Sequence, residues 1–181
     1  MKKVGLFGIT GNPPHLGHLR ATKVALGECD EVWVSPVYMH PFNKTFIDYE
    51  HRLKMINMMF FGLDKVRVVE IDKDFYQINK RMPYSYDLLS FIQEKESNIS
   101  PVLIVGEDNY SPEVWKKFFK YDKIDNEFGV IVIRDSGCHS TQIRDFAKIE
   151  NWERIEKECG KKISDYLCKN YIYSLGEKNE S

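Results

Sequence analysis

The chain has 181 residues and a mass of 21.3 kDa, which suits one domain with a single core and is too small for two ordinary domains. Apolar residues make up 43% of the chain and charged residues 29%, a balance that excludes disordered, collagen-like and disulfide-stabilised proteins. The formal charge of -1 gives no global reason to expect nucleic acid or an acidic membrane as a partner. Any anion site must therefore be local.

Cysteine usage and the N-terminus indicate the compartment. The cysteines, Cys29, Cys138, Cys159 and Cys168, have no CxxC spacing, so we expect free thiols. The opening sequence MKKVGLFGIT has a short apolar stretch that meets glycine and proline before it could form a signal peptide or a membrane span. We therefore expect a cytoplasmic protein.

Predicted strands and helices alternate along the whole chain. Short apolar runs bounded by glycine or proline predict strands, and apolar residues at three- and four-residue spacing predict helices. In chain order the predicted elements are a strand at Val4–Gly8, a helix at Leu16–Leu26, a strand at Glu31–Val37, a helix at Tyr49–Phe61, a strand at Val66–Ile71, a helix at Tyr86–Gln93, a strand at Val102–Gly106, a helix from Pro112 through Phe119, a strand at Gly129–Arg134, a helix capped by Ser140 and running to Phe146, and a polar helical tail at Trp152–Leu167.

This alternation predicts a doubly wound α/β fold, with a mainly parallel sheet, helices on both faces and a helical C-terminus. We expect residues 1–175 to form a single domain and residues 176–181 to fray. In such a sheet the ligand crevice lies beyond the carboxyl ends of the strands. The loops that follow predicted strands there, and that carry the unusual residues, are Gly8–His18, His40–Lys44, Gly106–Tyr110 and Arg134–Arg144.

The loop after the first strand, GITGNPPHLGH, places two histidines three residues apart at the start of a helix. His15 and His18 would share one helix face beside unpaired backbone N–H groups and the positive end of the helix dipole, which suits an oligophosphate. Gly11 and Gly17 would let the backbone and a nucleobase approach closely. The alternatives are histidines that only pack or decorate the surface, or a zinc site, which is disfavoured because the loop supplies no third ligand.

Two motifs give the chain a resemblance to a known superfamily. PPHLGH resembles the (H/T)xGH motif of the nucleotidylyltransferases, and CHSTQIR, residues 138–144, resembles their ISSTxIR-type motif. Between and after them, EHRLKM, MPYSYDLL, VGEDNYSPEVWKKF and ISDYLCKNYIY are similar to segments of the bacterial nicotinate/nicotinamide mononucleotide adenylyltransferases. The resemblance spans nearly the whole chain. It implies a Rossmann-like nucleotidyltransferase fold and adenylyl transfer from ATP to nicotinate or nicotinamide mononucleotide, giving the dinucleotide and pyrophosphate in NAD biosynthesis.

The resemblance also implies roles for individual residues. His15, His18 and Arg144 would be catalytic. ATP would be bound by Gly8, Ile9, His15, Gly17, His18, Ser140, Thr141 and Arg144. The mononucleotide would be bound by Thr10, Lys44, Ser85, Tyr86, Gly106, Asp108, Trp115 and Arg134. Mg²⁺ would be held by the ATP phosphates rather than by protein ligands.

The chain departs from the family pattern at several positions. Asn12 stands where bacterial members usually have the aspartate of G-T-F-D-P, Asp87 replaces a threonine, and Cys138 and His139 replace Ile-Ser. The first two changes bear on the pyridine-nucleotide side of the site, so the choice between acid and amide mononucleotide stays open.

Several candidate residues have a second, structural interpretation. Ser140 could be a simple helix cap and Asp108 a turn residue. Trp115 could belong to the core rather than stack on the pyridine ring, and Lys44 could be an exposed loop lysine. Arg52 could anchor its helix to a carboxylate instead of reaching a ligand. No role is assigned to His40 or His51.

Three other functions compete with adenylyl transfer to a pyridine mononucleotide. Another nucleotidylyltransferase, such as a phosphopantetheine adenylyltransferase or a small cytidylyltransferase, would share both motifs but usually lacks the GxD segment followed by tryptophan. A non-catalytic nucleotide sensor would have less need of His15, His18, Ser140 and Arg144. A nucleic-acid binder is disfavoured by the net charge. We therefore expect ATP and a pyridine mononucleotide as partners, no nucleic acid and no membrane, and leave a homo-oligomer open.

Overall fold

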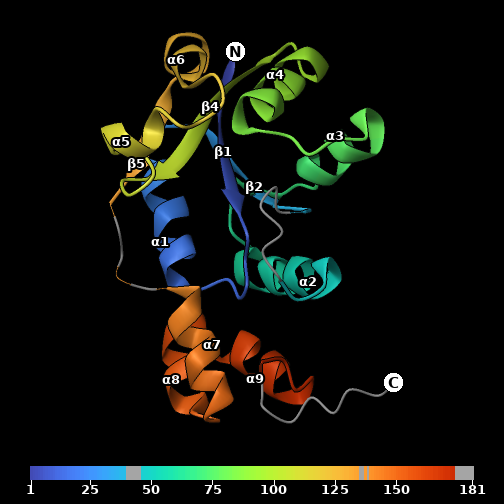
Figure 1. Ribbon diagram of the computed structural model, residues 1–181, viewed down its shortest axis with the longest axis vertical. Helices are drawn as coiled ribbons and strands as arrows, with labels where there is room; N and C mark the ends of the chain where they lie inside the picture. The colour runs from blue at the N-terminus through green and yellow to red at the C-terminus, as the bar shows by residue number, and fades with distance from the viewer. Residues whose placement is uncertain (40–45, 135–136, 138, 174–181) are drawn as a thin grey trace.

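A single parallel sheet organises the computed structural model (Figure 1). The structure describes residues 1–39, 46–134, 137 and 139–173, and within these ranges the sheet has five strands in the order β3-β2-β1-β4-β5. The strands are β1 (Lys2–Ile9), β2 (Glu31–Pro36), β3 (Val66–Val68), β4 (Ile99–Gly106) and β5 (Val130–Ile133). Every neighbouring pair is parallel, so the predicted α/β class is confirmed.

The strand order reverses direction at the centre of the sheet. β1 pairs with β2 on one side and with β4 on the other, so the chain first builds outward to β3 and then returns to add β4 and β5. The connections after β1 and β4 leave toward opposite faces at this point. Their carboxyl ends therefore open a crevice between them, where doubly wound folds bind ligands.

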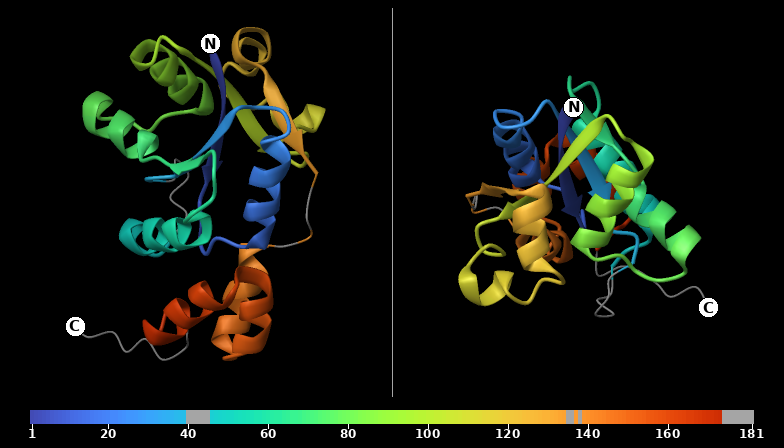
Figure 2. Two further views of the ribbon diagram at one scale, coloured as in Figure 1. Left: turned by 180° about the vertical axis from the view of Figure 1, so that it is seen from behind. Right: turned by 90° about the horizontal axis from the view of Figure 1, so that it is seen from above.

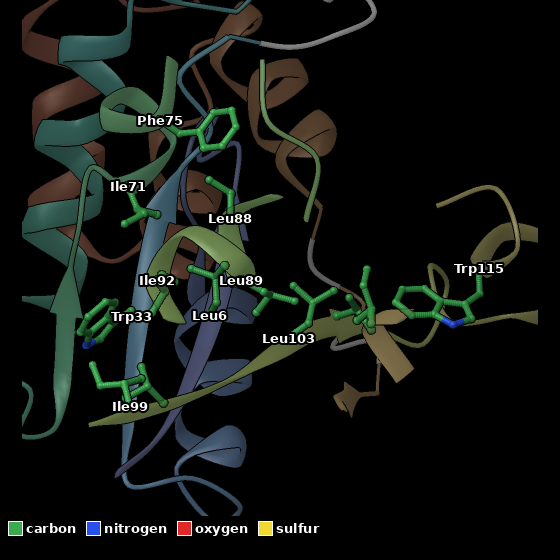
Figure 3. Packing of buried hydrophobic residues seen from close by; sticks show 13 residues of the cluster. Leu6, Trp33, Ile71, Phe75, Leu88, Leu89, Ile92, Ile99, Leu103 and Trp115 are labelled. Carbon is green, nitrogen blue, oxygen red and sulfur yellow. The ribbon is translucent and has the colours of Figure 1, made fainter. Parts of the chain in front are cut away.

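Helices cover both faces of the sheet (Figure 2). Side chains alternate along β1: Val4 and Leu6 pack into one cluster, and Phe7 and Ile9 into the other. The first cluster, shown in Figure 3, includes residues of α3 (Ile71–Asn79) and α4 (Ser85–Lys95). The second includes residues of α1 (Leu16–Ala25) and α2 (Tyr49–Phe60). Burial on both sides explains why the central strands are almost continuously apolar.

The last helices form a unit of their own against α2. They are α7 (Ser140–Lys148), α8 (Trp152–Cys159) and α9 (Lys161–Lys169), and they lie together beyond the ends of α1 and α2 (Figure 1). Ile143, Ile155 and Leu167, one from each helix, are fully buried in a third cluster that also contains Met55 of α2. This cluster packs the three C-terminal helices against the helix that follows β2.

Most predicted elements are present with ends shifted by a few residues, but three predictions were wrong. The strand predicted to reach Ile71 ends at Val68, and Ile71 begins α3, a helix that was missed. Ile71 and Phe75 lie one turn apart on that helix and enter the core. The short run of alternating apolar residues fits a strand equally well until tertiary packing selects the helix.

The other two errors concern where helices end. The helix predicted through Phe119 stops as α5 (Pro112–Trp115), and α6 (Tyr121–Lys123) and a π-helical segment η1 (Ile124–Phe128) follow. The single tail predicted at Trp152–Leu167 is two helices, because Gly160 lies between α8 and α9 with a φ of 82°. That left-handed backbone suits glycine and cannot continue a helix.

The structure also bears on the state of the cysteines and on membrane-spanning helices. Cys29, Cys159 and Cys168 are thiols outside any disulfide, whereas Cys138 lies outside the described residues, as do Lys44 and the tail at 176–181. None of the helices in the described part of the chain combines the length and apolar content needed to cross a bilayer.

Candidate active site

A pocket of about 530 Å³ lies at the carboxyl ends of β1, β4 and β5, where the strand order reverses. The loop after β1 and the first turns of α1 and α7 complete its walls. The sequence-predicted residues that line it are Gly8, Ile9, Thr10, His15, Gly17, His18, Ser85, Gly106, Asp108, Arg134 and Ser140. Thus the parallel fold gathers most of both predicted binding sets at one sheet edge.

Four predicted site residues are not part of this wall. Thr141, Arg144, Tyr86 and Trp115 have other surroundings. The Tyr86 hydroxyl donates to Glu127 over 2.9 Å, and its ring packs on Phe128. Lys44 lies outside the described residues, so its assignment to the mononucleotide stays a prediction.

The two histidines of the first motif form a close pair at the start of α1. His15 is the residue preceding the helix, and its backbone N–H donates to Nδ1 of His18 over 3.0 Å. The two rings lie 3.8 Å apart between centroids. Burial, together with the adjacent His15 ring, lowers the pKa of His18 to about 3. His18 is therefore neutral near pH 7.

The same hydrogen bond fixes which nitrogen of His18 carries the proton. Because Nδ1 accepts from the His15 backbone, the neutral ring holds its hydrogen on Nε2. His18 lines the pocket beside Gly17 and the first turn of α1, where unpaired backbone N–H groups and the helix dipole favour an anion. The arrangement offers an oligophosphate several donors without placing a full positive charge on this imidazole.

The second motif holds the loop that precedes these histidines. The Ser140 hydroxyl donates to the carbonyl of Pro13 over 2.9 Å, and Nη1 of Arg144 donates to the carbonyl of Asn12 over 2.7 Å. Ser140 was predicted to cap α7, but His139 occupies that position and Ser140 is the first helical residue. Its hydroxyl is directed to another loop, so the cap prediction was wrong.

Arg144 lies beside the pocket rather than along it. Its second terminal nitrogen donates to Oγ1 of Thr141 over 2.9 Å, so the two nitrogens of the fork contact protein groups. This places Arg144 and Thr141 as supports of the loop carrying Gly11 and Asn12. Direct contact of either residue with ATP phosphates stays a prediction.

Two glycines of the pocket wall lie where a Cβ would meet a neighbouring side chain, and Gly11 also has a left-handed backbone. Gly11 has a φ of 63°, and a Cβ at this position would lie 2.6 Å from Cδ1 of Ile56. At the end of β4, a Cβ on Gly106 would overlap the carboxylate of Asp108. Asp108 therefore folds back over the strand end, where it lines the pocket.

Arg52 and Asp72 lie behind the loops at the ends of β1 and β2. Arg52 is 2% exposed and donates to four backbone carbonyls, those of Thr10, Val37, Tyr38 and Ile47. Neither sequence interpretation, a carboxylate anchor or a ligand contact, describes these bonds. Asp72 accepts the backbone N–H of Tyr38 over 3.0 Å, and burial raises its pKa to about 6.

Trp115 lies in the core in this structure. Its side chain is 5% exposed, its indole N–H donates to Asp125 over 2.9 Å, and its ring packs between Tyr110 and Phe118. Figure 3 shows it at one end of the first cluster, beyond Leu103. The aromatic residue of this segment that lines the pocket is Phe118. Stacking of Trp115 on a pyridine ring stays a prediction that this arrangement does not display.

Replacing Trp115 with alanine is expected to lower the free energy of unfolding by about 3–5 kcal/mol, because a large buried ring and its hydrogen bond are removed. Chemical denaturation of W115A checks this value. The stacking hypothesis predicts instead a loss of mononucleotide affinity of about 10- to 100-fold with ATP affinity retained. A variant as stable as the wild type would contradict the core assignment.

Sequence reasoning missed some pocket residues. They include Asn109, Phe118 and His139. His139 had a signal, since it directly precedes Ser140 in the second motif and sits at the N-terminus of α7. Phe118 lies three residues after Trp115, beyond the end of α5, and lines the pocket. No pattern in the sequence marks that helix end.

Side chains that commonly bind metal ions do not cluster in the described part of the chain. Among them, no three histidine, cysteine, aspartate or glutamate side chains gather closely enough to hold one.

Comparison with known proteins identifies the family to which this fold belongs. The model of a family described as cytidylyltransferase-like matches residues 6–164. The chain belongs to the cytidylyltransferase-like family. This confirms the resemblance to nucleotidylyltransferases drawn from the two motifs. The family match covers the whole described sheet beyond Gly5 and reaches into α9.

Individual members of the family extend the similarity over nearly the full chain. The nicotinate-nucleotide adenylyltransferase of Bacillus subtilis is 28% identical over 192 aligned residues, covering 99% of this chain and 97% of the relative. A crystal structure described as a candidate nicotinate-nucleotide adenylyltransferase from Vibrio parahaemolyticus superposes with a TM-score of 0.76 at 26% identity, covering 96% of each chain. The Plasmodium falciparum nicotinic acid mononucleotide adenylyltransferase complexed with NaAD shares the fold, with a TM-score of 0.77 at 18% identity and coverage of 96% of this chain and 98% of that one.

Proposed function

We propose that this chain transfers the adenylyl group of MgATP to nicotinate mononucleotide, giving nicotinate adenine dinucleotide and pyrophosphate in NAD biosynthesis. One observation carries the proposal: Ser140 and Arg144 of the second motif bond to the loop that leads into His15 and His18 at the edge of the pocket. The two nucleotidylyltransferase motifs, remote in sequence, thus form one site. The similarity to the Bacillus subtilis enzyme over almost the whole chain supports nicotinate mononucleotide as the acceptor.

The chemistry needs positioning and charge stabilisation rather than a general base. A 5′-phosphate oxygen of the mononucleotide forms a bond to the α-phosphorus of ATP as the bond from that phosphorus to the bridging β-phosphate oxygen breaks. Pyrophosphate leaves with the electron pair, and no proton has to move because the nucleophile is already an anion. Mg²⁺ enters as part of the substrate and neutralises phosphate charge.

Each wall of the pocket has a role in this scheme. The Nε2–H of His18 and the N-terminus of α1 would donate to the ATP phosphates, where negative charge grows in the transition state. The backbone at Gly8 and Ile9 would lie against the adenosine. Asp108 would accept from a ribose hydroxyl, and Arg134 would meet a phosphate at the end of β5.

The decisive experiment incubates the purified protein with MgATP and nicotinate mononucleotide and follows pyrophosphate and dinucleotide formation. Parallel reactions replace the acceptor with nicotinamide mononucleotide or phosphopantetheine, and ATP with CTP. Formation of nicotinate adenine dinucleotide as the fastest product supports the proposal. Turnover only with phosphopantetheine or only with CTP, or binding without turnover, would refute it.

We expect Arg144 to contact the ATP phosphates in addition to the loop, so replacing it with lysine should raise the KM for ATP about 10-fold and change the KM for the mononucleotide less than about threefold, since a point charge replaces a two-pronged donor. Because a lysine ammonium also cannot bond to the Asn12 carbonyl and the Thr141 hydroxyl in the same planar geometry, kcat should fall as well. Steady-state kinetics with each substrate varied in turn provides the measurement. The exposed Arg154 on α8 gives the matched control, R154K. Equal changes in the KM values for ATP and the mononucleotide would count against contact of Arg144 with the ATP phosphates.

A further inference from the structure

The end of the described chain returns to the loop beside the pocket. After α9 the backbone turns through left-handed conformations at Tyr171 and Tyr173, with φ of 52° and 65°. Between them Ile172 is 4% exposed and packs in the third cluster. Left-handed backbone is uncommon for residues other than glycine, so surrounding contacts must hold this turn. It brings the Tyr173 hydroxyl to Asn12, 161 residues earlier in the sequence.

Asn12 is the point at which several elements meet. Its side chain is buried, with an exposed fraction of 7% for the residue, and its Oδ1 accepts from the Tyr173 hydroxyl over 2.6 Å and from the backbone N–H of Ile47 over 3.5 Å. Its own carbonyl accepts from Arg144. Burial raises the pKa of Tyr173 well above its usual range, so the hydroxyl keeps its proton as a donor near neutral pH.

We propose that Tyr173 is a positioning residue for adenylyl transfer, acting through its hydrogen bond to Asn12 to set the loop that places Gly11, His15 and His18 in the pocket. This rests on the proposed function. The C-terminal part of the described chain thus holds Asn12 at two points. Tyr173 bonds to the Asn12 side chain, and Arg144 bonds to the Asn12 backbone carbonyl. Small displacements of groups around a reacting phosphate cost far more in rate than in affinity, so the effect falls on kcat.

The test compares Tyr173→Phe with Tyr166→Phe. Both substitutions delete one hydroxyl from the C-terminal unit, and the Tyr166 hydroxyl lies 2.7 Å from Nδ1 of His51 on α2, away from the pocket. We expect Y173F to lower kcat about 10-fold while both KM values change less than about threefold, and Y166F to keep kcat within about twofold. Wild-type kcat in folded Y173F, or an equal loss in Y166F, would overturn the proposal.

Changing the acceptor provides an independent arm. Asn12→Asp keeps an oxygen for the Tyr173 hydroxyl, whereas Asn12→Ala removes it. We expect N12D to retain kcat within about threefold, N12A to lose about 10-fold, and N12A/Y173F to be no slower than the slower single variant. Additive losses, or N12D as slow as N12A, would show that the bond between the two side chains does not carry the effect.

A readout without turnover separates this inference from the proposed function. The imidazole NMR signals of His15 and His18 report the geometry of the helix start directly. We expect them to shift in Y173F and to stay unchanged in Y166F. If wild-type protein forms no dinucleotide, the proposed function fails, but these signals still test whether the hydrogen bond from Tyr173 to Asn12 positions the two histidines. Unchanged imidazole signals in Y173F would refute positioning by Tyr173 even if the wild type is active.

Discussion

Replacement of His18 by alanine is expected to lower kcat about 100-fold while the protein stays folded, since removing one well-placed donor to a developing charge typically costs on the order of 3 kcal/mol. The structure identifies the Nε2–H of His18 as that donor. Burial and the adjacent His15 ring keep His18 neutral, with a pKa of about 3, and its Nδ1 is already engaged by the His15 backbone. The Nε2–H is therefore the group available to a phosphate in the pocket.

Replacement of His18 by asparagine distinguishes the roles of the two ring nitrogens. The Oδ1 of H18N occupies the place of Nδ1 and still accepts the His15 N–H, but nothing replaces the Nε2–H. We expect H18N to be as stable as the wild type in thermal unfolding and to lose turnover like H18A. His51→Ala on α2 is the matched control, because its ring contacts Tyr166 and does not line the pocket. A near wild-type kcat for H18N under saturating substrates would show that the Nε2–H of His18 is not the donor to the phosphate.

The part of the pocket that carries His15 and His18 could be predicted because its determinants are local. Glycines and prolines directly after an apolar run fix the end of β1, and two histidines three residues apart define one face of α1. The alternation of strands and helices then predicts a parallel sheet, which places the ends of β4 and β5 beside the end of β1. Gly106, Asp108 and Arg134 follow from that topology without any knowledge of side-chain contacts.

The supports of the site could not be predicted in the same way. Arg144 and Tyr173 act on Asn12 across 132 and 161 residues of sequence, and their acceptors carry no distinguishing pattern. Trp115 shows the limit for aromatic residues: its position after the end of β4 suits a ligand contact, yet the end of α5 turns its ring into the core. Packing rather than local propensity decides such cases.

Arg52 is the clearest instance of a residue whose role the sequence conceals. All four of its acceptors are backbone carbonyls, which every residue possesses, so no carboxylate partner could reveal the contact. Its guanidinium joins the loop after β1 at Thr10, the end of β2 at Val37 and Tyr38, and the approach to α2 at Ile47. Burial lowers its pKa, so the contacts must offset the cost of placing a charge there.

Replacement of Arg52 by methionine is expected to lower the free energy of unfolding by about 3–5 kcal/mol, because buried carbonyls are left without donors while the apolar stem is retained. Lysine keeps the charge, but its single ammonium cannot reach acceptors spread around a planar fork, so R52K should recover less than about half of the loss. Chemical denaturation of both variants measures the difference, with the exposed Arg154→Met as control for loss of charge alone. Because the Arg52 contacts include Thr10, which lines the pocket, R52M should also raise the KM for at least one substrate at temperatures where it remains folded. An R52M protein within about 1 kcal/mol of the wild type would show that water or rearranged backbone satisfies these carbonyls, and that Arg52 does not hold the loops together.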